Sequence, residues 1–122
     1  MRLRIATFAT AAVLLTTGDS WAHRFPLRAG SEIRVIATAY CQKGRTESGQ
    51  HTASDIIAAD PQVLPFGSTV RIIDGPRRGV YTVLDTGGAI KGLKIDIFIN
   101  DCDRAEAFGR RRVRLRVLRI GS

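Results

Sequence analysis

The sequence has few of the residues that mark several specialised classes of protein. Among 122 residues it contains two cysteines and two histidines, too few for a disulfide-dense miniprotein or a four-cysteine zinc module. Four prolines and twelve glycines without a repeat argue against a collagen-like chain. With 44% hydrophobic residues the chain can bury a core, which argues against disorder. Its length accommodates one small domain.

Acidic residues are scarce relative to basic ones. Eleven Asp and Glu stand against 19 Lys and Arg, so the formal net charge is +8 and the isoelectric point is about 10.7. A basic balance of this kind first suggests nucleic acid as a partner. Whether nucleic acid is the partner depends on the cellular compartment of the protein, and the N-terminal residues indicate that compartment.

Residues 1–22 have the pattern of a secretory signal peptide. Arg2 and Arg4 precede an apolar stretch of about 13 residues, too short for a comfortable transmembrane span. Small residues at Ser20 and Ala22 predict cleavage after Ala22 and a mature domain of residues 23–122. The alternatives are an uncleaved anchor or a core helix. Secretion to the periplasm or cell envelope favours wall polymers over nucleic acid as partners, and we expect no stable membrane anchor.

The two cysteines are compatible with one disulfide. In an oxidising compartment Cys41 and Cys102 could pair, which would stabilise the fold by roughly 4 kcal/mol on the chain-entropy model. Two independent thiols are the alternative. A zinc site would need further ligands, and only His23 and His51 are available, so no metal or cofactor is expected.

Short strands dominate the expected secondary structure. Apolar alternation and turn residues predict strands at 32–40, 56–59, 68–73, 79–84, 94–99 and 111–120. Residues 103–108 predict one short helix, capped by Asp103 with Glu106 and ended by Gly109. In the last strand, apolar residues alternate with arginines, which gives an inner and a basic outer face. Six strands and one helix predict a small all-β barrel or sandwich.

Three aspartates adjoin apolar strand sequence and are candidates for chemistry: Asp60, Asp85 and Asp96. Burial of an unpaired carboxyl raises its pKa, and a carboxyl that is protonated near neutral pH can act as a general acid. The alternative is that these carboxylates cap turns or accept backbone N–H groups. Gly87 and Gly88 could line a cleft, because glycine permits close approach or positive φ. Lys91 could contact a polar substrate or pair with a carboxylate.

Several motifs together resemble the three-aspartate (3D) domain of bacterial cell-wall proteins. This family is similar to the catalytic barrel of membrane-bound lytic murein transglycosylases and to stationary-phase survival proteins. The most specific match is Asp-Thr-Gly-Gly-Ala-Ile-Lys-Gly at 85–92, followed by Ile-Asp-Ile-Phe at 95–98. The other matches occur in the family's order: Ala-Thr-Ala-Tyr at 37–40, Thr-Glu-Ser-Gly at 46–49, Ile-Ala-Ala-Asp-Pro at 57–61, Pro-Phe-Gly-Ser at 65–68 and Phe-Gly-Arg-Arg at 108–111.

The resemblance implies a six-stranded double-psi β-barrel that binds glycan strands of peptidoglycan. It implies a lytic transglycosylase, which cleaves the β-1,4 bond between N-acetylmuramic acid and N-acetylglucosamine without water and leaves 1,6-anhydromuramoyl ends. Asp96 takes the principal catalytic position, and Asp85 and Asp60 take the other two aspartate positions. The cleft-lining positions fall on Thr38, Tyr40, Gly87, Gly88 and Lys91. A monomer or a domain-swapped dimer is compatible with so short a chain.

Three alternatives remain open at the level of sequence. The barrel could bind polysaccharide without cutting it. Val-Leu-Asp-Thr-Gly at 83–87 also resembles the active-site string of aspartic proteases, although too few residues follow it for the rest of such an enzyme. The arginines at 110–119 could form a solvated strand face, attract anionic wall polymers or bind nucleic acid.

Overall fold

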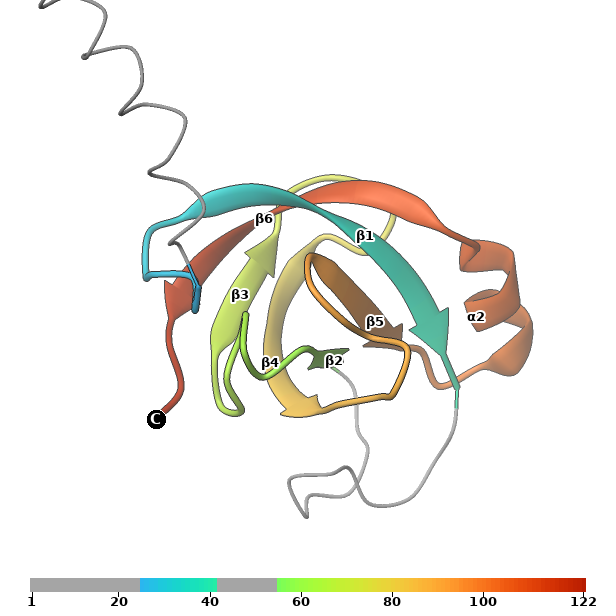
Figure 1. Cartoon of the computed structure of the whole chain (residues 1–122). Coiled ribbons are helices and arrows are strands. Elements are labelled where there is room, and N and C mark those ends of the chain that lie inside the picture. Colours follow the sequence, from blue (N-terminus) through green and yellow to red (C-terminus); the bar gives the residue numbers. More distant parts are fainter. Residues whose placement is uncertain (1–24, 42–54) are drawn as a thin grey trace, which may run out of the picture.

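The computed structural model describes residues 25–41 and 55–122, which form a closed barrel with one helix at its side (Figure 1). Around the barrel the strands follow the order β1-β5-β2-β4-β3-β6. The elements are β1 (Glu32–Tyr40), β2 (Ile56–Ala59), β3 (Thr69–Ile72), β4 (Gly79–Asp85), β5 (Lys94–Phe98), α2 (Cys102–Phe108) and β6 (Arg111–Arg119).

Alternating side chains of every strand fill the barrel. Val35 and Ala37 of β1 point inward, as do Ile95 and Ile97 of β5. The predicted inner face of β6 is confirmed, because its alternate apolar residues Val113, Leu115 and Val117 are buried in the same core. The residues between these positions therefore project outward, and any functional side chain on a strand must come from that outward set.

The strand order is that of a double-psi barrel. β1 pairs with β5 and β2 pairs with β4 in parallel, and the other four neighbouring pairs are antiparallel. Strands far apart in sequence therefore lie side by side, so that β5 sits between β1 and β2. The expected all-β, six-stranded double-psi barrel with a short helix is confirmed for the part of the chain that the structure describes.

Several element ends differ by one residue from the sequence-based expectation, and two of these differences bear on function or capping. Strand β4 extends through Asp85 rather than stopping before it. Helix α2 is capped by Asp101, whose side chain accepts a hydrogen bond from the Arg104 N–H at 3.1 Å. The expected cap, Asp103, lies inside the first turn, where its negative charge still suits the helix dipole. Gly109 ends the helix as predicted.

A disulfide joins Cys41 to Cys102 across 61 residues of sequence. It links the end of β1 to the start of α2, which packs beside that strand in Figure 1. Of the two alternatives for the cysteines, the paired one is therefore confirmed. The signal peptide expected at 1–22 and the loop at 43–54 lie outside the described residues. Within the described ranges, no helix is long and apolar enough to span a membrane.

Candidate functional site

Four residues form one row across the outside of the barrel. Ala58 on β2 pairs with Asp85 of β4 on one side and with Asp96 of β5 on the other, and Asp96 pairs in turn with Thr38 of β1. The sequence neighbours Ile57, Ala59, Ile95, Ile97 and Ala37 lie in the core, so the row faces outward. Two carboxylates thus flank a single methyl group; we call Asp85, Ala58, Asp96 and Thr38 the acid row.

A β-bulge brings Asp85 into the acid row. Ile57 pairs with Val83, but the next residue, Ala58, pairs with Asp85, so Leu84 is an extra residue in β4. A bulge of this kind re-aims a side chain and is common beside functional sites. Without the insertion, Leu84 would stand opposite Ala58, and Asp85 would fall one position past the row.

Hydroxyl and backbone donors fix both carboxylates. The Thr38 hydroxyl donates to Asp96 Oδ1 at 2.9 Å, and the Tyr40 hydroxyl donates to Asp85 Oδ2 at 3.2 Å. The Thr86 N–H donates to Asp85 Oδ1 at 2.9 Å. The Tyr40 ring packs against Phe98, with centroids 5.5 Å apart. Strand β1 therefore supplies one donor to each carboxylate from alternate outward positions.

Burial raises the pKa of Asp96 above the ordinary range of an aspartate, and the nearby Asp85 charge adds to that shift. The Thr38 hydrogen bond and the Lys94 charge act in the opposite direction. Burial also raises the pKa of Tyr40, with a further contribution from Asp85, so its phenol stays protonated and can donate. The acid row thus pairs one carboxyl whose pKa is raised with a second carboxylate held by hydrogen-bond donors.

Asp60 occupies a different environment. It is buried, yet the Gly92 and Gln62 N–H groups donate to its two oxygens at 2.9 and 3.0 Å. These two bonds lower its pKa. For Asp60 the expectation that burial raises the pKa is therefore wrong, because backbone donors outweigh desolvation. The alternative, a carboxylate that organises a turn, describes this residue.

The loop between β4 and β5 links these aspartates. Gly87 and Gly88 do not adopt positive φ; the positive φ lies at Gly92, at 70°, where the N–H meets Asp60. A Cβ at Gly88 would meet open space. Lys91 is exposed, and its charge contributes to lowering the Asp60 pKa. The expectation that Gly87 and Gly88 line a cleft stays a prediction.

Three residues of the site were not found from the sequence: Ala58, Lys94 and Phe98. Lys94 donates to the Ala89 carbonyl at 3.1 Å and so ties the loop to β5. The outward alternation of β5, Lys94–Asp96–Phe98, was the available signal for two of them. The importance of Ala58 depends on strand order, which the sequence did not give. Within the described residues, no three metal-ligating side chains gather.

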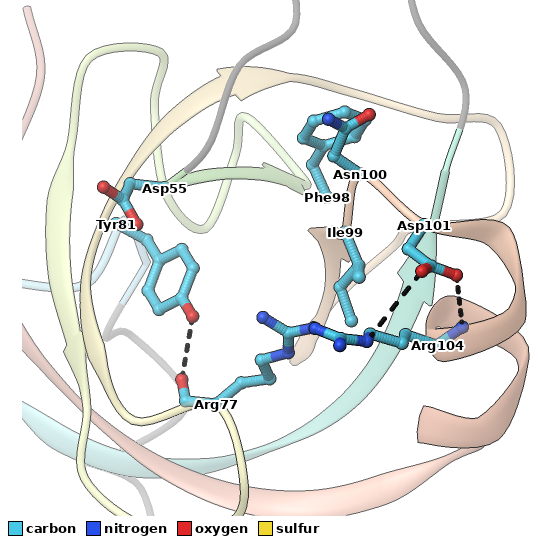
Figure 2. Close-up of a pocket in the computed structure, with 8 residues that line it drawn as sticks. All are labelled: Asp55, Arg77, Tyr81, Phe98, Ile99, Asn100, Asp101 and Arg104. Carbon is cyan, nitrogen blue, oxygen red and sulfur yellow. Dashed lines mark hydrogen bonds and ion pairs between the residues drawn. The ribbon is translucent and has the colours of Figure 1, made fainter.

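A cavity lined by described residues lies elsewhere, at one end of the barrel. It has a volume of about 230 Å³, and in Figure 2 the side chains of Arg77 and Arg104 point toward one another across it. Phe98 borders both this cavity and Tyr40, whereas none of the three aspartates lines it. Its lining residues are Asp55, Arg77, Tyr81, Phe98, Ile99, Asn100, Asp101 and Arg104.

The sequence profile of the 3D domain matches residues 55–119, which contain Asp60, Asp85 and Asp96. The chain belongs to the 3D domain family. Among 3D relatives, the chain is 39% identical over 99 residues to the cell wall-binding protein YocH of Bacillus subtilis, covering 74% of this chain and 33% of YocH. The chain spans well under half the length of the relatives it matches.

Solved structures share the 3D barrel at low sequence identity. The lytic transglycosylase MltA of E. coli, solved with bound chitohexaose, superposes with a TM-score of 0.53 at 21% identity, over 66% of this chain and 29% of MltA. A Streptomyces papain inhibitor superposes with a TM-score of 0.54 at 18% identity, over 75% of this chain and 97% of the inhibitor. One fold thus carries different functions, and function must be argued from the site.

Proposed function

We propose that this 3D domain is a lytic transglycosylase that cleaves the β-1,4 bond between N-acetylmuramic acid and N-acetylglucosamine in peptidoglycan. The observation that carries the proposal is the acid row, in which Asp96, with its raised pKa, lies one residue across from Asp85 on an outward face. Family membership and the cell wall-binding relative support the wall as the target.

The reaction needs one acid that gives and then recovers a proton. Protonated Asp96 donates to the glycosidic oxygen, the bond to C1 of the muramoyl ring breaks, and N-acetylglucosamine leaves with a free hydroxyl. The ring's own C6 hydroxyl attacks C1, and its proton passes to the Asp96 carboxylate. The 1,6-anhydro ring closes and Asp96 is regenerated. No water enters, unlike a hydrolase with two carboxylates across the bond.

The neighbours of Asp96 tune this cycle. The Asp85 charge helps to raise the Asp96 pKa by like-charge proximity. Thr38 orients the Asp96 carboxyl through its hydrogen bond. Tyr40 orients Asp85, and its half-buried ring, which packs on the buried Phe98, offers an aromatic face against which a sugar ring can pack.

Asp60 serves as a positioning residue in this proposal. The bond that it accepts from the Gly92 N–H fixes the chain just before β5, so it sets the path of the loop that follows Asp85. We propose that Gly87, Gly88 and Lys91 on that loop contact the glycan, which is supported by the open space at Gly88 and the exposure of Lys91. The domain would act outside the cytoplasm as residues 23–122 after removal of 1–22.

A non-catalytic wall-binding domain is the second candidate. It is favoured by the name of YocH, a cell wall-binding protein, of which the chain covers only a third. An outward face with two fixed carboxylates and the Tyr40 ring could hold a sugar without cutting it. A wall-binding domain and a lytic transglycosylase can be distinguished by one observation, because only the enzyme releases soluble fragments from peptidoglycan.

The deciding experiment incubates the purified chain with peptidoglycan sacculi and analyses the supernatant by mass spectrometry. Anhydromuropeptides, which lack the water that a hydrolase adds, are expected from the wild type and from Asp103→Asn. Asp103 is an exposed aspartate on α2, outside the acid row, so it is the matched control. Asp96→Asn should still pellet with sacculi but release no product. Wild-type pelleting without product would establish the binder, and hydrolysed reducing ends would exclude this mechanism.

A further inference from the structure

A second outward surface lies on β1, β6 and β3, away from the acid row. Its arginines alternate with core residues of their own strands, so their side chains share one face. Arg34 stands opposite Arg114, and Arg71 stands opposite Arg116. We call this surface the arginine face; its members are Arg34, Arg71, Arg112, Arg114 and Arg116.

Carboxylates neutralise only part of the arginine face. Glu32 lies 2.8 Å from Arg116 and 3.7 Å from Arg114, and Asp74 lies 3.1 Å from Arg114. The other three arginines, Arg34, Arg71 and Arg112, make no ion pair with any residue of the described ranges. Five guanidiniums against two carboxylates leave an excess of three positive charges on neighbouring strands.

This arrangement runs against the stability of the sheet. Like charges directly opposite each other on neighbouring strands are destabilising, and a surface selected for stability would alternate signs at these positions. Hydrogen bonds from Arg114 and the charge of Arg34 lower the pKa of Asp74. Even so, Glu32 and Asp74 offset only part of the repulsion between the arginines, and places where a local rule is broken are often functional. A shallow hollow of about 130 Å³ lies on the same face, and Arg34 and Arg112, both without an ion pair, line it together with Arg114 and Asp74.

We propose that the arginine face binds a linear envelope polymer that carries repeated phosphate groups, independently of the cleavage activity. A guanidinium group can donate two hydrogen bonds to the oxygens of one phosphate. Side chains two residues apart along β6 place their cations about 6.8 Å apart, so successive arginines can bind successive anionic groups of one polymer. The hollow between Arg34 and Arg112 takes one phosphate. Besides the arginines, the residues that pair with or line this face are Glu32, Asp74 and Val113, and none of them is an aromatic platform on which a nucleic-acid base could stack.

The test measures binding of poly(glycerol phosphate) to the full chain by fluorescence titration over a range of salt concentrations. With about three phosphates neutralised, the logarithm of the affinity should fall by about 2 for each tenfold rise in salt. The double variant Arg34→Gln/Arg112→Gln should weaken binding at low salt by about tenfold or more and reduce that slope to about 0.7. Asp96→Asn should bind like the wild type, which separates this proposal from the proposed cleavage.

A charge-matched control is available in the same chain. Arg28→Gln/Arg78→Gln removes two exposed arginines outside the face and should leave the affinity within about twofold. An equal loss in both double variants would mean that net charge alone attracts the polymer, and would overturn the proposal. Single-stranded DNA with the same number of phosphates should bind no more tightly than poly(glycerol phosphate); tighter binding would assign the face to nucleic acid instead. Circular dichroism melting confirms that each variant is folded.

Discussion

Thr38 and Arg34 project from the same side of β1, about 13 Å apart. Thr38 belongs to the acid row and Arg34 to the arginine face, and the charged groups of these two surfaces differ in their hydrogen bonding and their exposure to water. In the acid row, Asp96 and Asp85 each accept a hydrogen bond from β1, and both lie partly shielded from water. On the arginine face, Arg34, Arg71 and Arg112 have no ion pair within the described residues and project into solvent or a shallow hollow.

The difference has a physical consequence. Charges that are partly buried interact strongly and are screened little by salt, whereas exposed charges are screened over about 10 Å at moderate ionic strength. Fixed neighbours can therefore shift the pKa of Asp96, while the arginine face acts mainly through long-range attraction. The first arrangement suits chemistry on one bond, and the second suits loose capture of a polymer.

The largest expected effect separates the two surfaces by activity. Asp96→Asn should lower the rate of anhydro-product release by about 10²–10⁴-fold, the usual contribution of a general acid. Arg34→Gln/Arg112→Gln should leave the rate on short, uncharged glycan fragments unchanged, because neither arginine is in the acid row. A product assay on both variants makes the comparison, and an equal loss in the two would erase the distinction.

The disulfide should matter more to the stability of the fold than any surface charge. Replacing Cys41 and Cys102 by alanine frees a loop that spans 61 residues of sequence, which costs about 4 kcal/mol on the chain-entropy model. Urea unfolding, with and without reductant for the wild type, measures this loss. If the alanine variant were as stable as the wild type, the link between β1 and α2 would contribute nothing.

The third prediction concerns the pH profile and tests the tuning of Asp96 directly. A general acid is active while protonated, so activity should fall as pH rises through the raised Asp96 pKa. Asp85→Asn removes a charge that raises this pKa, so the alkaline limb should move to lower pH. Thr38→Val removes a hydrogen bond that lowers it, so the limb should move to higher pH. Shifts in the same direction would contradict the assigned interactions.

The same pKa predicts how stability depends on pH. Because the folded-state pKa of Asp96 is raised, the protonated carboxyl favours the folded state, and that contribution is lost as pH rises through the folded pKa. Asp96→Asn has no charge to desolvate. It should therefore gain stability relative to the wild type as pH rises, although we expect it to be inactive, and thermal melting across pH measures this difference.

Strand pattern was enough to predict the barrel, whereas the site depended on strand order. Alternation placed Val113, Leu115 and Val117 in the core and the intervening arginines outside, because period-two patterns report one face of a strand directly. The position of Asp85 beside Ala58 could not be read this way, since it requires both the parallel pairing of β2 with β4 and the bulge at Leu84. Pairing partners are set by the closed sheet, not by local sequence.

Local hydrogen bonding explains why the three aspartates differ. Each adjoins apolar sequence, so burial alone predicts the same pKa shift for all of them. The pKa of Asp60 is lowered instead, because Gly92, with its positive φ, directs an N–H at the Asp60 carboxylate. The pKa of Asp96 is raised as expected, because its one side-chain donor does not outweigh desolvation. The sequence names the candidate carboxylates, and the backbone around each decides which one can be an acid.

The smallest expected effect is on the stability cost of the arginine face. Arg34 faces Arg114 across β1 and β6, so Arg34→Gln should relieve a like-charge contact and raise the free energy of unfolding by up to about 0.5 kcal/mol. The gain should shrink as salt screens the pair. Glu32→Gln is the matched opposite change, because it removes the carboxylate that bridges Arg114 and Arg116, and it should destabilise by a similar amount. If Arg34→Gln instead lowered the free energy of unfolding in low salt, the contact between Arg34 and Arg114 would stabilise the fold rather than destabilise it.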